Sequence, residues 1–133
     1  MIDTNIFVSS FFGGNPRRII DLWKNGDLLL CLSPGIVDEY IEVLQRMSLG
    51  EAGEIQELLK LFAKGYHAVF THTTPELSIV TEDPDDDKFI ECAVALDAKH
   101  IISGDKALLD VKNYMGIRIQ SPREFLEKNR DNK

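Results

Sequence analysis

The chain of 133 residues is 44% hydrophobic and 28% charged, an ordinary balance for one globular domain that excludes a disordered or fibrous protein. Its 15 basic and 22 acidic residues give a net charge of −7, which argues against a protein that coats nucleic acid through bulk positive charge. The longest apolar run covers only residues 28–32, and no export leader opens the chain. We therefore expect a cytoplasmic protein that does not enter membranes, with Cys31 and Cys92 as buried free thiols.

Short strand-like runs alternate with helical patterns along the chain. Apolar runs bounded by turn residues predict strands, in chain order, at residues 1–2, 28–32, 67–71, 79–80, 101–103 and 117–119. Amphipathic spacing and capping residues predict helices, in chain order, at residues 15–25, 33–47, 54–64, 83–94 and 121–126. The polar residues 128–133 are expected to fray.

This alternation predicts a single domain over residues 1–133 in the α/β class. The expected architecture is a three-layer α/β/α sandwich with a mostly parallel central sheet and right-handed crossovers. In such sheets the functional site lies at the carboxyl ends of the strands, where helices begin. Fold alone locates a site in this way without naming a reaction.

Acidic residues gather at this expected edge of the sheet. Asp3 directly follows the first strand, and Asp105 follows the strand at residues 101–103. Other acids lie early in two of the predicted helices: Asp38, Glu39, Asp85, Asp86 and Asp87. Converging carboxylates repel one another, and Mg²⁺ or Mn²⁺, which prefer oxygen ligands, would remove that conflict. Three or four acids with no lysine or arginine beside them therefore predict a metal site that acts on phosphodiesters.

Each acid also has a purely structural interpretation. Asp38 and Glu39 lie off the apolar stripe of their helix, which is typical of a solvated face. Asp85 is best explained as a capping acid that complements the helix dipole. Either Asp86 or Asp87 could reach the strand edge from its position in the first turn. The functional interpretation depends on convergence of the set and not on any one member.

Four segments with these acids occur in a distinctive order: Asp-Thr-Asn-Ile at residues 3–6, Ile-Val-Asp-Glu-Tyr at 36–40, Asp-Pro-Asp-Asp-Asp-Lys-Phe at 83–89, and Ser-Gly-Asp-Lys at 103–106. In this order and spacing the chain resembles the PIN domain family, the nuclease fold of VapC-like toxins and many RNA-processing enzymes. The resemblance implies a ribonuclease that uses one or two Mg²⁺ or Mn²⁺ ions. The implied acidic quartet is Asp3, Glu39, Asp87 or Asp86, and Asp105, with Asp87 ranked before Asp86.

The same resemblance implies supporting residues and partners. Hydrogen-bonding neighbours of the acids would be Thr4, Asn5 and Ser103. Candidate contacts to an RNA substrate are basic residues outside the acidic pocket: Arg17, Arg18, Lys24, Lys88 and Lys106. Possible protein partners are a small antitoxin, covering the acidic site with a basic side chain, and a second copy of the chain.

Three alternatives bear on this interpretation. Family members usually have several apolar residues before the first aspartate, whereas only Met1 and Ile2 precede Asp3. Either the start is misassigned or trimmed, or the first strand is truncated. A truncated first strand slightly favours a catalytically weak or inactive module that binds RNA or a partner. A haloacid-dehalogenase-type phosphatase is disfavoured because Asn5 stands where its Asp-x-Asp motif needs an acid. A response-regulator receiver is disfavoured because the paired acids at residues 85–87 come too late in the chain.

Overall fold

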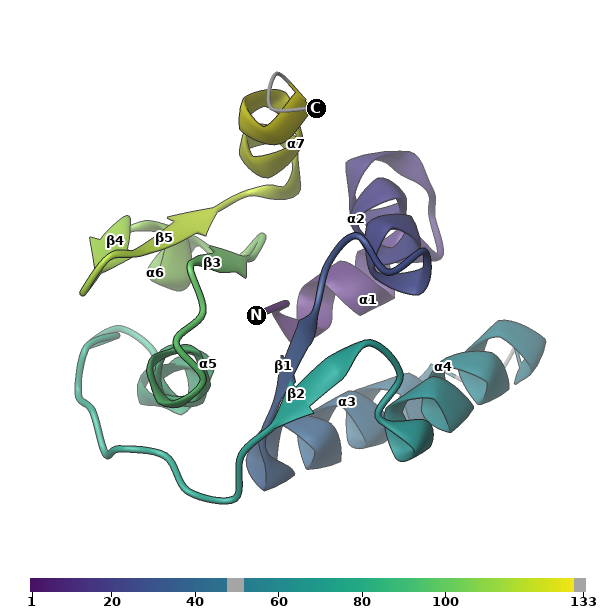
Figure 1. The fold of residues 1–133 in the computed structure, drawn as a ribbon, viewed down its shortest axis with the longest axis horizontal. Helices are drawn as coiled ribbons and strands as arrows, with labels where there is room; N and C mark the ends of the chain where they lie inside the picture. Colours follow the sequence, from purple (N-terminus) through teal and green to yellow (C-terminus); the bar gives the residue numbers. More distant parts are fainter. Residues whose placement is uncertain (48–51, 131–133) are drawn as a thin grey trace.

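The computed structural model describes residues 1–47 and 52–130 as a helix-rich α/β fold (Figure 1). The helices are α1 (Thr4–Ser10), α2 (Gly14–Lys24), α3 (Pro34–Arg46), α4 (Ala52–Lys64), the 3₁₀ turn η1 (Pro84–Asp86), α5 (Asp87–Ala95), α6 (Lys106–Leu109) and α7 (Pro122–Arg130). The strands are β1 (Leu30–Leu32), β2 (Ala68–Phe70), β3 (His100–Ile102), β4 (Asn113–Tyr114) and β5 (Ile117–Gln120).

The strands pair in two small sheets. β1 runs parallel to β2, with Cys31 opposite Val69. β3 runs parallel to β5, and β5 pairs antiparallel with β4, which gives the order β3-β5-β4. The α/β class is therefore confirmed, but the predicted three-layer sandwich with one mostly parallel central sheet is not, since the paired strands within residues 1–47 and 52–130 form two separate sheets.

The N-terminal segment lies between these two sheets, as Figure 1 shows. Ile2 forms one parallel bridge with Ile102, and the Asp3 N–H donates to the Ile102 carbonyl at 2.9 Å. On the other side the hydroxyl of Tyr40, in α3, donates to the Ile2 carbonyl. The bridge to β3 and the buried phenol of Tyr40 together hold this segment, so that Asp3 directly follows an extended residue.

An aromatic cluster fixes the first four helices around that segment. Phe7, Trp23, Tyr40 and Phe62 come from α1, α2, α3 and α4 and are all buried. The ring centroids of Phe7 and Tyr40 lie 4.8 Å apart, and those of Tyr40 and Phe62 lie 5.2 Å apart, which are normal distances for aromatic pairs. Any movement of α3, which carries Glu39, would disturb this packing.

Helix α1 begins directly after Asp3, where the sequence analysis predicted no helix. Its Thr, Ile, Phe and Val residues have modest helix propensity, so the local pattern gave little sign of a helix. The burial of Ile6 and Phe7 against the core favours the helix in spite of that propensity. The short helix α6 was also not predicted.

Most other predicted elements are present with shifted ends. The helices expected at residues 15–25, 33–47, 54–64, 83–94 and 121–126 correspond to α2, α3, α4, η1 with α5, and α7. The predicted strand at 79–80 is wrong, since that segment has no strand pairing among the described residues. The predicted fraying from residue 128 is wrong as far as residue 130, where α7 ends, and residues 131–133 lie outside the described part. Cys31 and Cys92 are buried and free, as expected.

None of the helices in the described residues combines the length and the apolar character that a membrane span requires.

Candidate metal-binding active site

Asp3 and Asp105 are joined through one serine. Asp3 is only 3% exposed, and its Oδ2 accepts a hydrogen bond from Ser103 Oγ at 2.6 Å. The same Ser103 Oγ accepts from the Asp105 N–H at 2.9 Å. Burial raises the pKa of Asp3, and the charges of Asp105 and Glu39 add to that rise, while the hydrogen bonds from Ser103 and from the Asn5 backbone oppose it. Ser103 therefore orients the first acid and the backbone of the last one together.

Asp105 also belongs to a group of three carboxylates, the acidic cluster, with Asp83 and Asp86. One carboxylate oxygen from each lies within 4.8 Å of the other two. Asp86 Oδ2 is buried and has no hydrogen-bond partner among the described residues. Burial raises the pKa of Asp86 to about 8, with further contributions from contact with the Asp105 carboxyl group and from the charges of Asp105, Asp83 and Asp3.

A divalent cation suits this arrangement. Buried carboxylate oxygens are normally hydrogen-bonded, and Asp86 Oδ2 has no such partner among the described residues. A bound ligand would supply the missing partner. Like charges this close oppose full ionisation, and an added cation would reverse the pKa rise. Hard ions such as Mg²⁺ and Mn²⁺ take carboxylate oxygens as ligands. The residues present therefore fit a metal of that class.

Asp87, ranked first as the third acid, has a different position. Its Oδ1 accepts hydrogen bonds from the backbone N–H groups of Ile79 and Val80, at 2.9 and 2.8 Å. One turn later on α5, Glu91 accepts from the Leu77 N–H at 2.8 Å. The two carboxylates hold residues 77–80 against α5, which explains why that apolar segment needs no strand partner. The geometry thus favours Asp86 over Asp87 at the acidic cluster.

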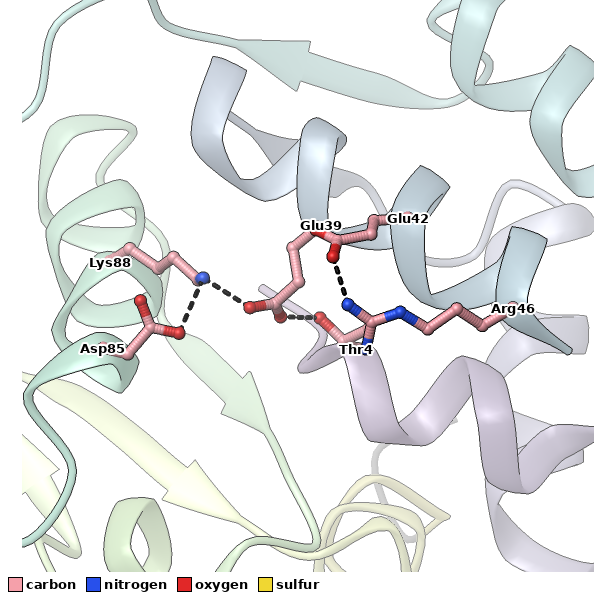
Figure 2. Close-up of polar contacts among 6 residues, drawn as sticks. All are labelled: Thr4, Glu39, Glu42, Arg46, Asp85 and Lys88. Carbon is pink, nitrogen blue, oxygen red and sulfur yellow. Dashed lines mark hydrogen bonds and ion pairs between the residues drawn. The ribbon is translucent and has the colours of Figure 1, made fainter.

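Glu39 is engaged by two side chains from other elements, as Figure 2 shows. One of its carboxylate oxygens accepts from the Thr4 hydroxyl, and the other pairs with the ammonium of Lys88. Lys88 also contacts Asp85 at 3.1 Å. Burial lowers the pKa of Lys88 and the bonds to Glu39 and Asp85 raise it, with a net upward shift, so the lysine is charged. The expectation of acids without a neighbouring cation is therefore wrong for Glu39.

The basic residues of α2 are engaged by acids of α4. Arg17 lies 3.9 Å from Glu54, and Lys24 lies 3.2 Å from Glu57. Arg18 lines a groove of about 500 Å³ between α2 and α7, and none of the site acids lines that groove. The proposed role of these three basic residues in RNA binding stays a prediction.

Of the other residues predicted for the site, some contact the site acids and some are exposed to solvent. Lys106 is 86% exposed and pairs with Asp110, one turn along the chain, at 3.2 Å. Asn5 is exposed and contributes its backbone N–H to Asp3, whereas Thr4 and Ser103 are buried and donate to site acids. Asp38 is exposed, as the solvated-face interpretation has it.

Asp83 is the member of the cluster that sequence reasoning did not select. It precedes the 3₁₀ turn η1, and its carbonyl accepts from the Asp86 N–H at 3.0 Å. Side chains three residues apart in a 3₁₀ turn lie on the same side, so Asp83 and Asp86 meet. The Asp-Pro-Asp-Asp stretch carried that signal, because proline after Asp83 favours a turn start there.

A family model for the PIN domain matches residues 1–107. The chain belongs to the PIN domain family. The matched range includes every acid of the site, from Asp3 to Asp105, and confirms the resemblance of the motifs. PIN domains are usually metal-dependent nucleases, which agrees with the acidic cluster of this one. No curated protein and no solved structure matches the chain.

Proposed function

We propose that this PIN domain is a ribonuclease that hydrolyses RNA phosphodiester bonds with Mg²⁺ or Mn²⁺. The observation that carries the proposal is the buried, unpartnered oxygen of Asp86 among the carboxylates of Asp83 and Asp105. A protein gains nothing in stability from three acids within 4.8 Å unless a cation or a shared proton compensates them. Together with membership of a nuclease family, this arrangement supports metal-dependent chemistry.

Each residue has a distinct task in this proposal. Asp86, Asp105 and Asp83 would hold the ion, and the buried Asp3 adds negative charge beside them. When bound, a divalent cation polarises a phosphoryl oxygen and lowers the pKa of a water molecule. Ser103 keeps the Asp3 carboxylate and the Asp105 backbone in register, which limits the reorganisation that catalysis requires.

We further propose that the protein is the toxin component of a toxin–antitoxin pair. This finer assignment depends on the similarity of the Asp-Pro-Asp-Asp-x-Lys-Phe stretch at residues 83–89 and of Ser-Gly-Asp-Lys at 103–106 to a bacterial and archaeal subgroup of PIN-domain toxin components. The small antitoxin would place a basic side chain over the acidic cluster, whose carboxylates have no basic partner among the described residues. A homodimer is a second possible assembly of the chain.

The test is cleavage of a labelled single-stranded RNA pool with Mn²⁺, with Mg²⁺ or with EDTA. We expect products with either metal, none with EDTA and none from the Asp105→Asn variant. Asp97→Asn is the matched control, because Asp97 is exposed and has a positive φ that asparagine tolerates. Equal cleavage in every sample would reject the metal-dependent mechanism, and faster cleavage of a DNA pool would reject RNA as the preferred substrate.

An inactive PIN-fold binding module is the second candidate. The ion pair between Lys88 and Glu39 favours it, since it neutralises one of the four expected acids. Calorimetric titration with Mn²⁺ separates the two candidates. The module would bind RNA without binding the ion, whereas the nuclease must bind the ion.

A further inference from the structure

The acids at the site fall into two sets, and only one of them includes a cation. We propose that the Lys88 ammonium takes the place of a second metal ion, so that this PIN domain binds one divalent ion, at Asp83, Asp86 and Asp105. This inference rests on the proposed metal-dependent function and specifies how many ions it uses. It assigns Lys88 as a positioning residue for Glu39.

The ammonium of Lys88 is held by two separate elements. It contacts Glu39 from α3 and Asp85 from η1, and the lysine side chain is only 23% exposed (Figure 2). Its ammonium also lies 5.7 Å from the ring centroid of Phe89. An ion pair at a fully exposed surface is worth little, but a lysine with two partners and partial burial is fixed in place. Lys88 therefore behaves as a resident cation.

Both oxygens of Glu39 already have partners. One accepts from the Thr4 hydroxyl and the other faces Lys88, and the Glu39 side chain is 22% exposed. To ligate a metal ion, this carboxylate would have to lose at least one of these contacts. Asp86 has the opposite condition, since its Oδ2 is buried without a partner. The free ligand atom thus belongs to Asp86 and not to the carboxylate that faces Lys88.

Electrostatics supports the same division. The two sets are close enough for the charge of Glu39 to raise the pKa of Asp3, which is itself linked to Asp105 through Ser103. A divalent ion beside Glu39 would lie against a fixed ammonium and be repelled by it. An ion at Asp86 and Asp105 meets carboxylates that have no basic partner among the described residues.

Mn²⁺ titration calorimetry, with a count of ions per chain, tests this proposal. We expect one ion for the wild type and two for Lys88→Met, because removal of the ammonium frees Glu39 and Asp85. Lys88→Arg keeps the charge and should bind one ion. Lys99→Met is the matched control: it makes the same change in net charge at an exposed lysine whose one ion pair among the described residues is with Asp97, and it should also bind one ion.

Glu39→Gln gives an independent result if Lys88→Met does not fold. Because Glu39 is not a ligand in this proposal, Glu39→Gln should still bind one ion, with an affinity within about threefold of the wild type. Two ions in the wild type, one ion in folded Lys88→Met, or loss of the ion in Glu39→Gln would each overturn the inference and leave the metal-dependent function standing. A wild-type chain that binds no Mn²⁺ would overturn both.

Discussion

Two groups of carboxylates lie side by side in this PIN domain and differ in what neutralises them. Glu39 and Asp85 share the ammonium of Lys88, so this group already contains a cation. Asp83, Asp86 and Asp105 converge without a basic partner in the described part of the chain, and one buried oxygen has no hydrogen bond. The comparison shows that clustered acids point to a metal only where the protein itself supplies no cation. The predictions below change one group or its supports and leave the other unchanged.

The largest effect is expected when the neighbours Asp86 and Asp87 are substituted one at a time and the two variants are compared. Asp86→Asn removes one carboxylate of the acidic cluster and should lower the rate of RNA cleavage by roughly 100-fold or more, because the ion loses a charged ligand. Asp87→Ala should change the rate much less but should destabilise the fold by about 2–4 kcal/mol, since two backbone N–H groups lose their acceptor. Initial rates and urea unfolding measure the two effects.

A matched control keeps this contrast sharp. Asp87→Asn retains an oxygen acceptor for the Ile79 and Val80 N–H groups and should recover most of the stability lost in Asp87→Ala. If Asp87→Asn abolishes cleavage in a folded protein and Asp86→Asn does not, the third acid is Asp87 and the assignment from geometry fails.

Ser103→Ala should have the next largest effect. The substitution removes the donor to Asp3 and the acceptor for the Asp105 N–H, so both strand ends lose orientation. Loss of such a supporting hydrogen bond typically lowers metal affinity or activity by roughly 10–100-fold. Calorimetry with Mn²⁺ and cleavage rates should fall together in this variant, whereas Ser103→Thr, which keeps the hydroxyl, should lose less. A Ser103→Ala protein with unchanged Mn²⁺ affinity would show that Ser103 only stabilises the fold.

The pH dependence of stability reports on the acidic cluster. The pKa of Asp86 is raised from 3.8 to about 8, so the folded protein retains a proton that the unfolded chain releases. This contribution to stability is complete below about pH 4 and is lost as pH rises through about 8. In EDTA we expect the melting temperature to fall by a few degrees across that window, and Asp86→Asn to flatten the decline. Saturating Mn²⁺ should also flatten it, because the ion binds the ionised form. A melting temperature that rises steadily from pH 5 to pH 8 in EDTA would contradict the geometry of the cluster.

The sequence predicted the helices better than the sheet. Residues 33–47 and 54–64 carry a helical apolar period and strong end signals, and α3 and α4 form close to those bounds. The division of the strands into two sheets was not predictable from apolar runs. In the structure Ile2 makes one bridge to Ile102, and within the described residues no ladder joins the two sheets. Helix α1 was missed because core burial of Phe7 outweighs a weak local propensity.

For the site, chain order identified most of the acids and the hydroxyl groups that support them, but it missed Asp83 and the ion pair of Glu39. The positions of Asp3, Asp105 and Ser103 follow from strand ends, and the structure brings them together. The choice between Asp86 and Asp87 needed the 3₁₀ turn η1, because the rotation of about a third of a turn between consecutive residues decides which carboxylate faces Asp105. The pairing of Lys88 with Glu39 joins residues 49 positions apart and had no local signal.

The smallest effect is expected at Lys106, which directly follows Asp105 of the acidic cluster. Its side chain is 86% exposed and pairs only with a half-exposed Asp110, so it is available to a phosphate group. Lys106→Ala should raise the KM for single-stranded RNA about two- to threefold with kcat unchanged, and should reduce the salt slope of binding by roughly 0.7, the value for one phosphate contact on a single strand. Lys99→Ala, at an exposed lysine just before the start of β3 and so at the opposite end of that strand from Asp105, is the control and should keep the wild-type slope. An unchanged salt slope in Lys106→Ala would mean that Lys106 does not contact a phosphate group of the bound RNA.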